Sequence, residues 1–354
     1  MSLFYDVTKT SGSRQSSGLI RVSERLGQAL EENLGAAFVP VVWRQGKRCF
    51  TELSRRVPVQ MSGSDHFLTP EVFSAEERSG YFAHLEQSEV QRAAVFHDAI
   101  PLKYPEITWP KSVSRHPSYM TDLARLNQIF SVSQASQDDL IDFWDERKTL
   151  SLPQLSTIAL GADFFDRSTI RWTHAPQSVP LIVRIGIIEP RKNQKELLEV
   201  ACQLWDAGLK FELIFVGRVN PHFGKPIEKL IKRAKKSGYP VQLISKQSDE
   251  RLLNLYTKAH FTVFNSITEG FGLPVVESLW LGLPCISSRL PSLSTYFDQT
   301  TCISVESQAD LQSAMTRWLT HPEELDNATS AARQLTLPTW RGAAETILSW
   351  MNSD

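Results

Sequence analysis

Short apolar segments alternate with longer amphipathic segments along the whole chain. Segments with strand character run through residues 36–43, 93–100, 128–133, 156–162, 180–188, 210–217, 240–245, 260–266 and 284–288. They are apolar almost throughout and do not alternate with polar residues, which is typical of parallel strands covered on both faces. The pattern therefore predicts an α/β fold of doubly wound parallel sheets.

One stretch interrupts this alternation. Residues 166–180, DRSTIRWTHAPQSVP, are polar and contain prolines, as linkers do. Since the chain has 354 residues and domains hold roughly 100–200, two domains are expected. We predict Rossmann-like domains at 1–170 and 171–337, with a helix in 338–354 that packs back on the first. Such sheets bind ligands beyond the carboxyl ends of their strands, so the site is expected in an interdomain cleft.

Composition narrows the class of protein. The formal net charge of −1 gives no global attraction to nucleic acid. No apolar run approaches the ~20 residues that span a bilayer, and the N-terminus lacks the pattern of a secretory signal. The four cysteines form no C-x-x-C motif, so no zinc site is expected. We therefore expect a cytoplasmic protein.

The segment EGFGLPVVE, residues 269–277, has the strongest chemical signal. Gly270 and Gly272 lack a Cβ and let a ligand approach the backbone, and Pro274 suits the first turn of a helix. The free N–H groups at such a helix start favour phosphate. Glu269 and Glu277 flank this position as acceptors for hydroxyl groups. A ligand with phosphate between hydroxyl-bearing groups is a sugar nucleotide.

The sequence resembles retaining glycosyltransferases with the GT-B fold, in particular glycosyltransferase family 4. The resemblance is strongest from 181 to 290 and covers most of the chain. It is carried by EGFGLPVVESLWLGLPCISS (269–288), GIIEPRKNQKELLEV (186–200), FHDAIPLKYPE (96–106) and SSGLIRV (16–22). The resemblance implies two facing Rossmann-like domains with the nucleotide held by the second.

The resemblance also implies roles for individual residues. Glu277 would hold the ribose hydroxyls, and Glu269 would contact hydroxyls of the donor sugar. Lys192, beside Arg191, would neutralise the leaving diphosphate. The other implied donor contacts are the backbone amides of Gly270, Phe271, Gly272 and Leu273, the close approach at Gly18, and the imidazole of His97. Among these residues, Glu269, Lys192 and His97 would be catalytic.

The reaction implied is transfer of a hexose-type sugar, with retention, from a UDP- or GDP-sugar to a hydroxyl of a glycan or lipid-linked acceptor. No metal or other cofactor is expected. Many relatives carry an arginine where this chain has Ile187, which leaves open whether the diphosphate site has one cation fewer or another arginine supplies it. The basic stretch 225–240 is either a solvated helix face or a peripheral contact with the cytoplasmic face of a membrane.

Other functions fit the same residues in part. Glycoside hydrolases also use paired carboxylates, but on opposite sides of the scissile bond, whereas Glu269 and Glu277 lie on one loop and helix. A sugar-nucleotide epimerase would convert the donor with no acceptor present. A regulator or scaffold would bind sugar nucleotides without turnover. We expect glycosyl transfer and keep the epimerase and the regulator as alternatives.

Overall fold

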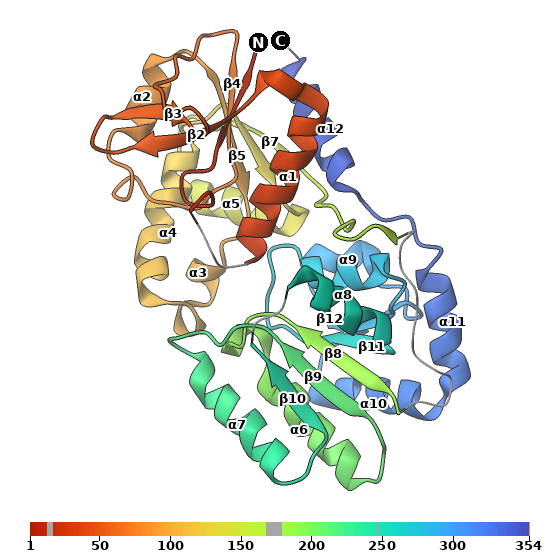
Figure 1. Cartoon of the computed structure of the whole chain (residues 1–354). Helices are drawn as coiled ribbons and strands as arrows, with labels where there is room; N and C mark the ends of the chain where they lie inside the picture. The colour runs from red at the N-terminus through yellow and green to blue at the C-terminus, as the bar shows by residue number, and fades with distance from the viewer. Residues whose placement is uncertain (13–16, 168–178, 246–247, 354) are drawn as a thin grey trace. The chain divides into compact units, whose positions relative to one another are not determined.

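A computed structural model of the protein describes residues 1–12, 17–167, 179–245 and 248–353. Within them the chain forms two compact units, residues 1–161 together with 338–354, and residues 162–337. Each unit is built on one sheet (Figure 1). The boundary predicted at residue 170 and most of the linker predicted at 166–180 lie outside the described residues.

The first unit contains a seven-stranded sheet in the order β3-β2-β1-β4-β5-β6-β7. Neighbouring strands are parallel except β2 and β3, which form an antiparallel hairpin. The strands are β1 Leu3–Asp6, β2 Phe38–Arg44, β3 Cys49–Glu52, β4 His66–Thr69, β5 Gln91–Phe96, β6 Gln128–Ser131 and β7 Gln154–Thr157. The helices are α1 Gly18–Leu34, α2 Tyr81–Gln87, α3 Ile100–Lys103, α4 Pro110–Leu123, α5 Gln134–Glu146 and α12 Trp340–Met351, with short 3₁₀ turns at Gly35–Ala37 and Pro105–Ile107.

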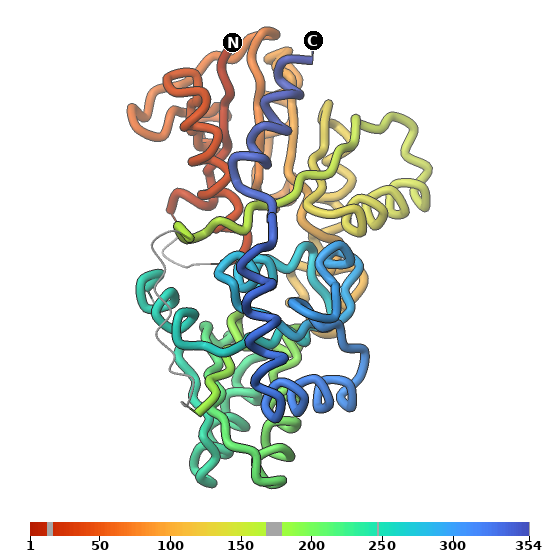
Figure 2. Tube along the Cα trace, turned by 90° about the vertical axis from the view of Figure 1, so that its right-hand side faces the viewer, coloured from red at the N-terminus to blue at the C-terminus, as the bar shows by residue number. Residues whose placement is uncertain are grey.

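Helix α12 lies alongside α1, although more than 300 residues separate their starts (Figures 1 and 2). Each helix begins at a hydroxyl cap. Ser17 Oγ accepts the N–H of Ile20 at 3.3 Å, and Thr339 Oγ1 accepts that of Gly342 at 3.1 Å. The indole of Trp350 in α12 meets the ring of His66 edge-on, with the centroids 4.8 Å apart. The segment 338–354 is therefore part of the first unit.

The second unit contains a six-stranded sheet in the order β10-β9-β8-β11-β12-β13, with every pair parallel. The strands are β8 Leu181–Ile185, β9 Glu212–Val216, β10 Val241–Ile244, β11 Phe261–Phe264, β12 Cys285–Ser288 and β13 Cys302–Val305. The helices are α6 Gln194–Asp206, α7 Gly224–Lys236, α8 Asp249–Lys258, α9 Leu273–Trp280, α10 Gln308–Thr320 and α11 Pro322–Ala332, with 3₁₀ turns at Pro190–Lys192 and Pro291–Tyr296.

Both sheets are doubly wound, which confirms the fold predicted from the apolar pattern. The strand order reverses between β1 and β4 in the first unit and between β8 and β11 in the second. Loops that leave the carboxyl ends of strands at such a switch point diverge and leave room for a ligand. These two places are where a site is expected in each unit.

Four strands were not predicted, namely β1, β3, β4 and β13. Each has only four residues, but β6, β7, β10, β11 and β12 are equally short and were predicted, so length alone does not explain the difference. Strand β3 also departs from the expectation of purely parallel sheets, because its turn at residues 45–48 returns the chain beside β2.

Candidate functional site

The carboxyl ends of β8 and β11 flank the switch point of the second unit. After β8 the chain runs through residues 186–193 into α6, and after β11 it runs through residues 265–272 into α9. The two loops are joined by a backbone hydrogen bond, in which the Ile267 N–H donates to the Arg191 carbonyl at 2.8 Å. The EPRKN and EGFG segments singled out from the sequence therefore form one site.

Glu269 is the centre of this site. Its Oε1 lies 2.5 Å from Lys192 Nζ, and its Oε2 lies 2.9 Å from Arg191 Nη1. Arg191 Nη1 also donates to the Thr268 carbonyl at 3.1 Å, and Arg191 Nη2 lies 3.1 Å from Glu189 Oε1. Three residues predicted from the sequence, Glu269, Lys192 and Arg191, are thus in direct contact.

The electrostatics of this cluster are set by burial and by its two kinds of charge. Burial by itself would raise the pKa of the Glu269 carboxyl, but the adjacent Lys192 and Arg191 lower that pKa to about 2. Burial, followed by the nearby Arg191, lowers the pKa of Lys192 to about 8 despite its contact with Glu269. Near neutral pH, Glu269 is therefore ionised and Lys192 is a cation close to its titration point.

Arg184 is a member of the cluster that the sequence analysis missed. It lies in β8 and is only 1% exposed. Its guanidinium donates to the carbonyl of Lys192 at 2.7 Å and to Ser266 Oγ at 3.0 Å, and so ties the β8 loop to the β11 loop from below. The only trace of this residue in the sequence is one arginine inside the apolar strand LIVRI.

Ile187 stands where many relatives carry an arginine, close in sequence to these cations. Ile187 is half-buried in the β8 loop, and no cation is supplied at its position. Arg191 stands beside Lys192 on the same carboxylate, while Arg184 is buried beneath it. Two arginines therefore accompany Lys192, of which only Arg191 is partly exposed.

Gly272 immediately precedes helix α9, next to the cluster. Gly272 has a φ of +97°, and a Cβ there would lie 2.9 Å from Leu293 Cδ1, so only glycine fits. No side chain among the described residues caps this helix start. The turn is held from inside by Phe271 and Leu273, whose side chains are buried. The start of α9 therefore offers backbone N–H groups and the positive end of the helix dipole.

Glu277 occupies the second turn of α9. Its side chain is only 2% exposed, unlike that of Glu269, which is 13% exposed in the loop before the helix. The two glutamates of EGFGLPVVE thus have different surroundings, since one is ion-paired in a loop and the other is enclosed by the helix and its neighbours.

Gly18 and His97, the remaining predicted site residues, belong to the first unit. Gly18 is the first residue of α1, and a Cβ placed on it meets no described atom within 4 Å. Packing within the described chain thus gives no reason for a glycine there.

His97 follows β5 and is buried. Its Nε2 lies 2.8 Å from the Pro70 carbonyl, which can only accept, so Nε2 carries the proton. Burial lowers the pKa of this imidazole, which leaves Nδ1 as an acceptor at neutral pH.

Three other expectations concern membranes and metals. The basic residues of α7 are exposed, while Ile227, Ile231 and Ala234 are buried in the core of the second unit. The apolar side of α7 is therefore not available to a bilayer. No helix in the described part of the chain is long and apolar enough to cross a membrane. Among the described residues, no group of three or more His, Cys, Asp or Glu side chains is placed to hold a metal ion.

Comparison with known proteins finds relatives of this chain. Residues 166–335 match the family described as glycosyl transferases group 1. The serotype-specific mannosyltransferase WbdA of Escherichia coli is 25% identical over 377 residues, covering 98% of this chain and 46% of the relative. A GDP-mannose-dependent alpha-(1-6)-phosphatidylinositol dimannoside mannosyltransferase of Mycobacterium tuberculosis is 24% identical over 204 residues, covering 56% and 52%. The chain spans about half the length of these curated relatives.

A solved structure shares the whole fold. Sucrose-phosphate synthase from Thermosynechococcus elongatus superposes with a TM-score of 0.72 at 16% identity, covering 99% of this chain and 98% of that one. At this identity the likeness speaks for the fold alone, and it agrees with the GT-B architecture expected from the motifs. The family match covers residues 166–335, and so includes the cluster of Lys192, Arg191 and Glu269 in the second unit. Residues 166–335 therefore match the glycosyl transferases group 1 family, and the chain has the GT-B fold.

Proposed function

We propose that the chain is a retaining glycosyltransferase that moves a mannose-type hexose from GDP-mannose to a hydroxyl of a glycan or lipid-linked acceptor. The observation that carries this proposal is the cluster of Lys192, Arg191 and Glu269 beside the uncapped start of α9. The choice of donor is supported by two relatives that are named mannosyltransferases, one of them GDP-mannose-dependent. A UDP-sugar is the alternative donor.

The cluster has the charge needed to stabilise a departing diphosphate. As the bond to the sugar breaks, negative charge grows on a phosphate oxygen, and fixed cations with oriented N–H groups stabilise it. Lys192 and Arg191 would supply the cations, and the amides of Gly270, Phe271, Gly272 and Leu273 the oriented donors. Glu269 holds both cations in place before the donor arrives and would then accept hydrogen bonds from hydroxyls of the sugar. Glu277 would hold the ribose hydroxyls.

The proposed reaction replaces one bond at the anomeric carbon. The bond from that carbon to the diphosphate oxygen breaks, and a bond to the acceptor oxygen forms on the same face. The acceptor proton moves to the leaving diphosphate oxygen, so no nucleophilic carboxylate is needed. His97, neutral with Nδ1 unprotonated, would accept a hydrogen bond from a sugar hydroxyl. The cations of the site are side chains, and we propose that no divalent metal is required.

The state of Glu269 argues against glycoside hydrolysis. The general acid of a glycosidase must carry a proton near neutral pH, which requires a raised pKa. Burial would raise the pKa of Glu269, but the charges of Lys192 and Arg191 have the larger effect and lower this pKa to about 2. An epimerase or a regulator could use the same site, so these alternatives are separated by experiment.

The donor proposal is tested by thermal unfolding with a panel of nucleotides and nucleotide sugars. GDP-mannose at a hundredfold excess over its Kd is expected to raise the midpoint by about 5–10 °C, because a ligand that binds only the native state stabilises it. GDP-mannose should leave the unfolding midpoint of the Glu277→Ala variant unchanged. A rise with UDP-sugars alone would reject the donor, and a rise with none would reject the transferase.

Turnover separates the remaining alternatives. A transferase releases GDP only when an acceptor is present, and the product linkage by NMR has the anomeric configuration of the donor. Conversion of the donor without an acceptor would indicate an epimerase, and binding without turnover a regulator. Loss of activity in EDTA, restored by Mg²⁺ or Mn²⁺, would contradict the proposed metal independence.

A pH dependence follows from the state of Lys192. In the free protein its ammonium loses its proton as the pH rises through about 8. Because kcat/KM reports the free protein, kcat/KM for the donor should fall above about pH 8, approaching tenfold per pH unit. The bound diphosphate favours the charged amine, so kcat should begin to fall at a higher pH.

Lys192→Arg is the control for this profile, because a guanidinium stays charged throughout the accessible range. Whatever its absolute activity, that variant should lose the fall near pH 8. An unchanged profile in Lys192→Arg would show that a different group titrates.

A further inference from the structure

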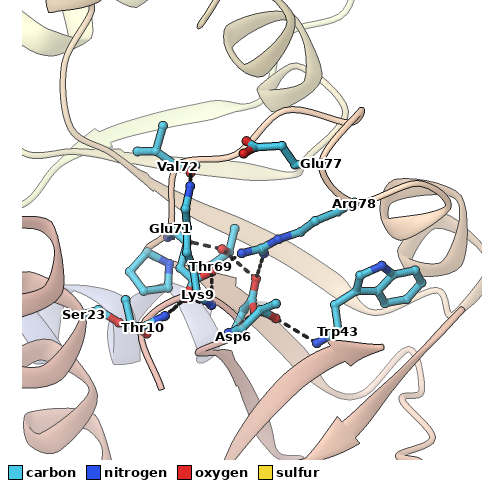
Figure 3. A network of polar contacts seen from close by, with 12 residues as sticks. Asp6, Lys9, Thr10, Ser23, Trp43, Thr69, Glu71, Val72, Glu77 and Arg78 are labelled. Atoms are coloured by element: carbon cyan, nitrogen blue, oxygen red, sulfur yellow. Dashed lines mark hydrogen bonds and ion pairs between the residues drawn. The ribbon is translucent and has the colours of Figure 1, made fainter. Parts of the chain in front are cut away.

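The switch point of the first unit is occupied by the protein's own charged side chains (Figure 3). Asp6 at the end of β1 and Glu71 just after β4 are both buried, and the buried guanidinium of Arg78 bridges them. Arg78 Nη1 lies 2.6 Å from Asp6 Oδ2, and its Nη2 donates to Glu71 Oε2. Two carboxylates thus share one arginine, and further donors are needed to stabilise the second negative charge.

Those donors come from the loop after β1, residues 7–12, which we call the β1 loop. Glu71 Oε1 accepts the N–H of Lys9 at 2.7 Å and the N–H of Thr10 at 2.8 Å, and the Thr10 hydroxyl donates to the same oxygen at 3.0 Å. Successive backbone N–H groups around one anion form the kind of concavity that elsewhere binds phosphate. Here the anion is part of the chain.

Glu71 accepts in all of these contacts, so the geometry calls for the ionised carboxylate. Burial and the charge of Asp6 raise the pKa of Glu71, and Arg78 with the Thr10 N–H opposes them. A neutral acid or an amide at this position would turn a hydrogen toward one of the surrounding donors, and that contact would be lost.

Asp6 holds the other side of the same loop. Its Oδ1 accepts the Thr8 N–H at 3.0 Å, and its Oδ2 accepts the Tyr81 hydroxyl at 2.7 Å. The Thr8 hydroxyl also contacts Asp6 and accepts the N–H of Trp43 at 2.8 Å. The β1 loop is therefore fixed to β2, to α2 and, through Glu71, to the loop after β4.

Side chains of the β1 loop and of β1 contact α1. The Thr10 hydroxyl lies 3.2 Å from the hydroxyl of Ser23 in α1, and the Tyr5 hydroxyl donates to the Ser23 carbonyl at 2.7 Å. Gly18 is the first residue of that helix, and a Cβ on it would meet none of the described atoms within 4 Å. A displacement of Thr10 would therefore disturb its contact with α1, the helix whose first residue, Gly18, the sequence resemblance places close to the donor.

We propose that Glu71 is a positioning residue, which fixes the β1 loop and through it the start of α1 for binding of the sugar nucleotide. This rests on the proposed function, together with the place near the donor that the resemblance implies for Gly18. Glu71 itself does not touch the donor, since its oxygens are engaged by Lys9, Thr10 and Arg78.

The test compares Glu71→Gln with Glu77→Gln in the full-length protein. Both remove one carboxylate from the segment after β4, but Glu77 pairs with the partly exposed Arg115 at 2.6 Å and does not touch the β1 loop. Glu71→Gln is expected to raise the donor KM about tenfold while kcat changes less than about threefold, because binding of the donor and not the bond-breaking step is disturbed. Glu77→Gln should match the wild type.

Limited trypsin digestion supplies a readout that needs no activity. The Lys9–Thr10 bond is protected while Glu71 holds both amides, so Glu71→Gln should be cut there about tenfold faster, as its open population rises. Thr10→Val removes only the hydroxyl contact and should lie between Glu71→Gln and the wild type. That variant also keeps the test usable if Glu71→Gln fails to fold.

The outcomes separate this proposal from the proposed function. Unchanged cleavage at Lys9 in both variants would overturn the role of Glu71 in fixing the loop. Faster cleavage with an unchanged donor KM would overturn the link to the donor. If the wild type transfers no sugar and binds no sugar nucleotide, the proposed function fails, and the link from Glu71 to the donor fails with it. The cleavage rates at Lys9 still test whether Glu71 fixes the β1 loop.

Discussion

Replacing Lys192 by glutamine is expected to lower kcat/KM for sugar transfer by about 10²–10³-fold, the size of effect seen when one charge-stabilising donor is removed from an active site. The amine lies 2.5 Å from Glu269 and is nearly buried. Water therefore replaces it poorly. Arg191 remains on the other carboxylate oxygen, and Arg184 is enclosed below, so neither can move into its place. Steady-state kinetics with varied donor measures the effect.

Lys195→Gln is the matched control. Lys195 lies three residues further on, in the first turn of α6, and its exposed amine is 3.6 Å from Glu199. A surface pair of this kind contributes about 0–1 kcal/mol, so the variant should retain wild-type activity and stability. Equal losses in Lys192→Gln and Lys195→Gln, or activity of Lys192→Gln within about threefold of the wild type, would contradict the role given to Lys192.

Gly217→Ala is expected to lower the free energy of unfolding of the second unit by about 3–5 kcal/mol, through the sum of backbone strain and overpacking. Gly217 follows β9 with a φ of +152°, and a Cβ there would lie 2.0 Å from the carbonyl oxygen of Gly186. That oxygen belongs to the main chain and cannot rotate away, so the ends of β8 and β9 must separate. The shift would carry the β8 loop, and Lys192 with it.

Gly208→Ala separates the two contributions. Gly208 has a φ of +91° but meets no described atom within 4 Å of a Cβ. It should therefore show only the cost of the left-handed backbone, about 1–2 kcal/mol. Urea unfolding of both variants gives the comparison. If the two midpoints moved equally, the close approach of Gly217 to Gly186 would have no energetic consequence.

The parts of the site that the sequence revealed are those in which local chemistry carries the signal. In EGFGLP, Gly272 has a positive φ that suits glycine, and Pro274 lies in the first turn of α9. Both requirements are met within a few residues, so they leave a readable pattern. Lys192 was implied by the family resemblance of the segment GIIEPRKNQKELLEV, in which a 3₁₀ turn runs over Pro190–Lys192.

The parts that were missed depend on contacts between distant segments. Arg184 looks like an exception inside an apolar strand, because one of its partners, Ser266, is 82 residues away. Asp6 and Arg78 are 72 residues apart, and nothing local distinguishes them from surface charges. Strands β1 and β4 lie at the centre of their sheet, yet each has only four residues. Their burial comes from their neighbours and not from their own pattern.

The placement of α12 on α1 has a consequence for biosynthesis. The first unit is discontinuous, since its residues 338–354 come after all of residues 162–337. During translation the ribosome must therefore complete the second unit before it makes the helix that covers α1. All residues of the second unit are therefore synthesised before the first unit is complete. Until α12 emerges, the nascent first unit lacks the helix that lies alongside α1.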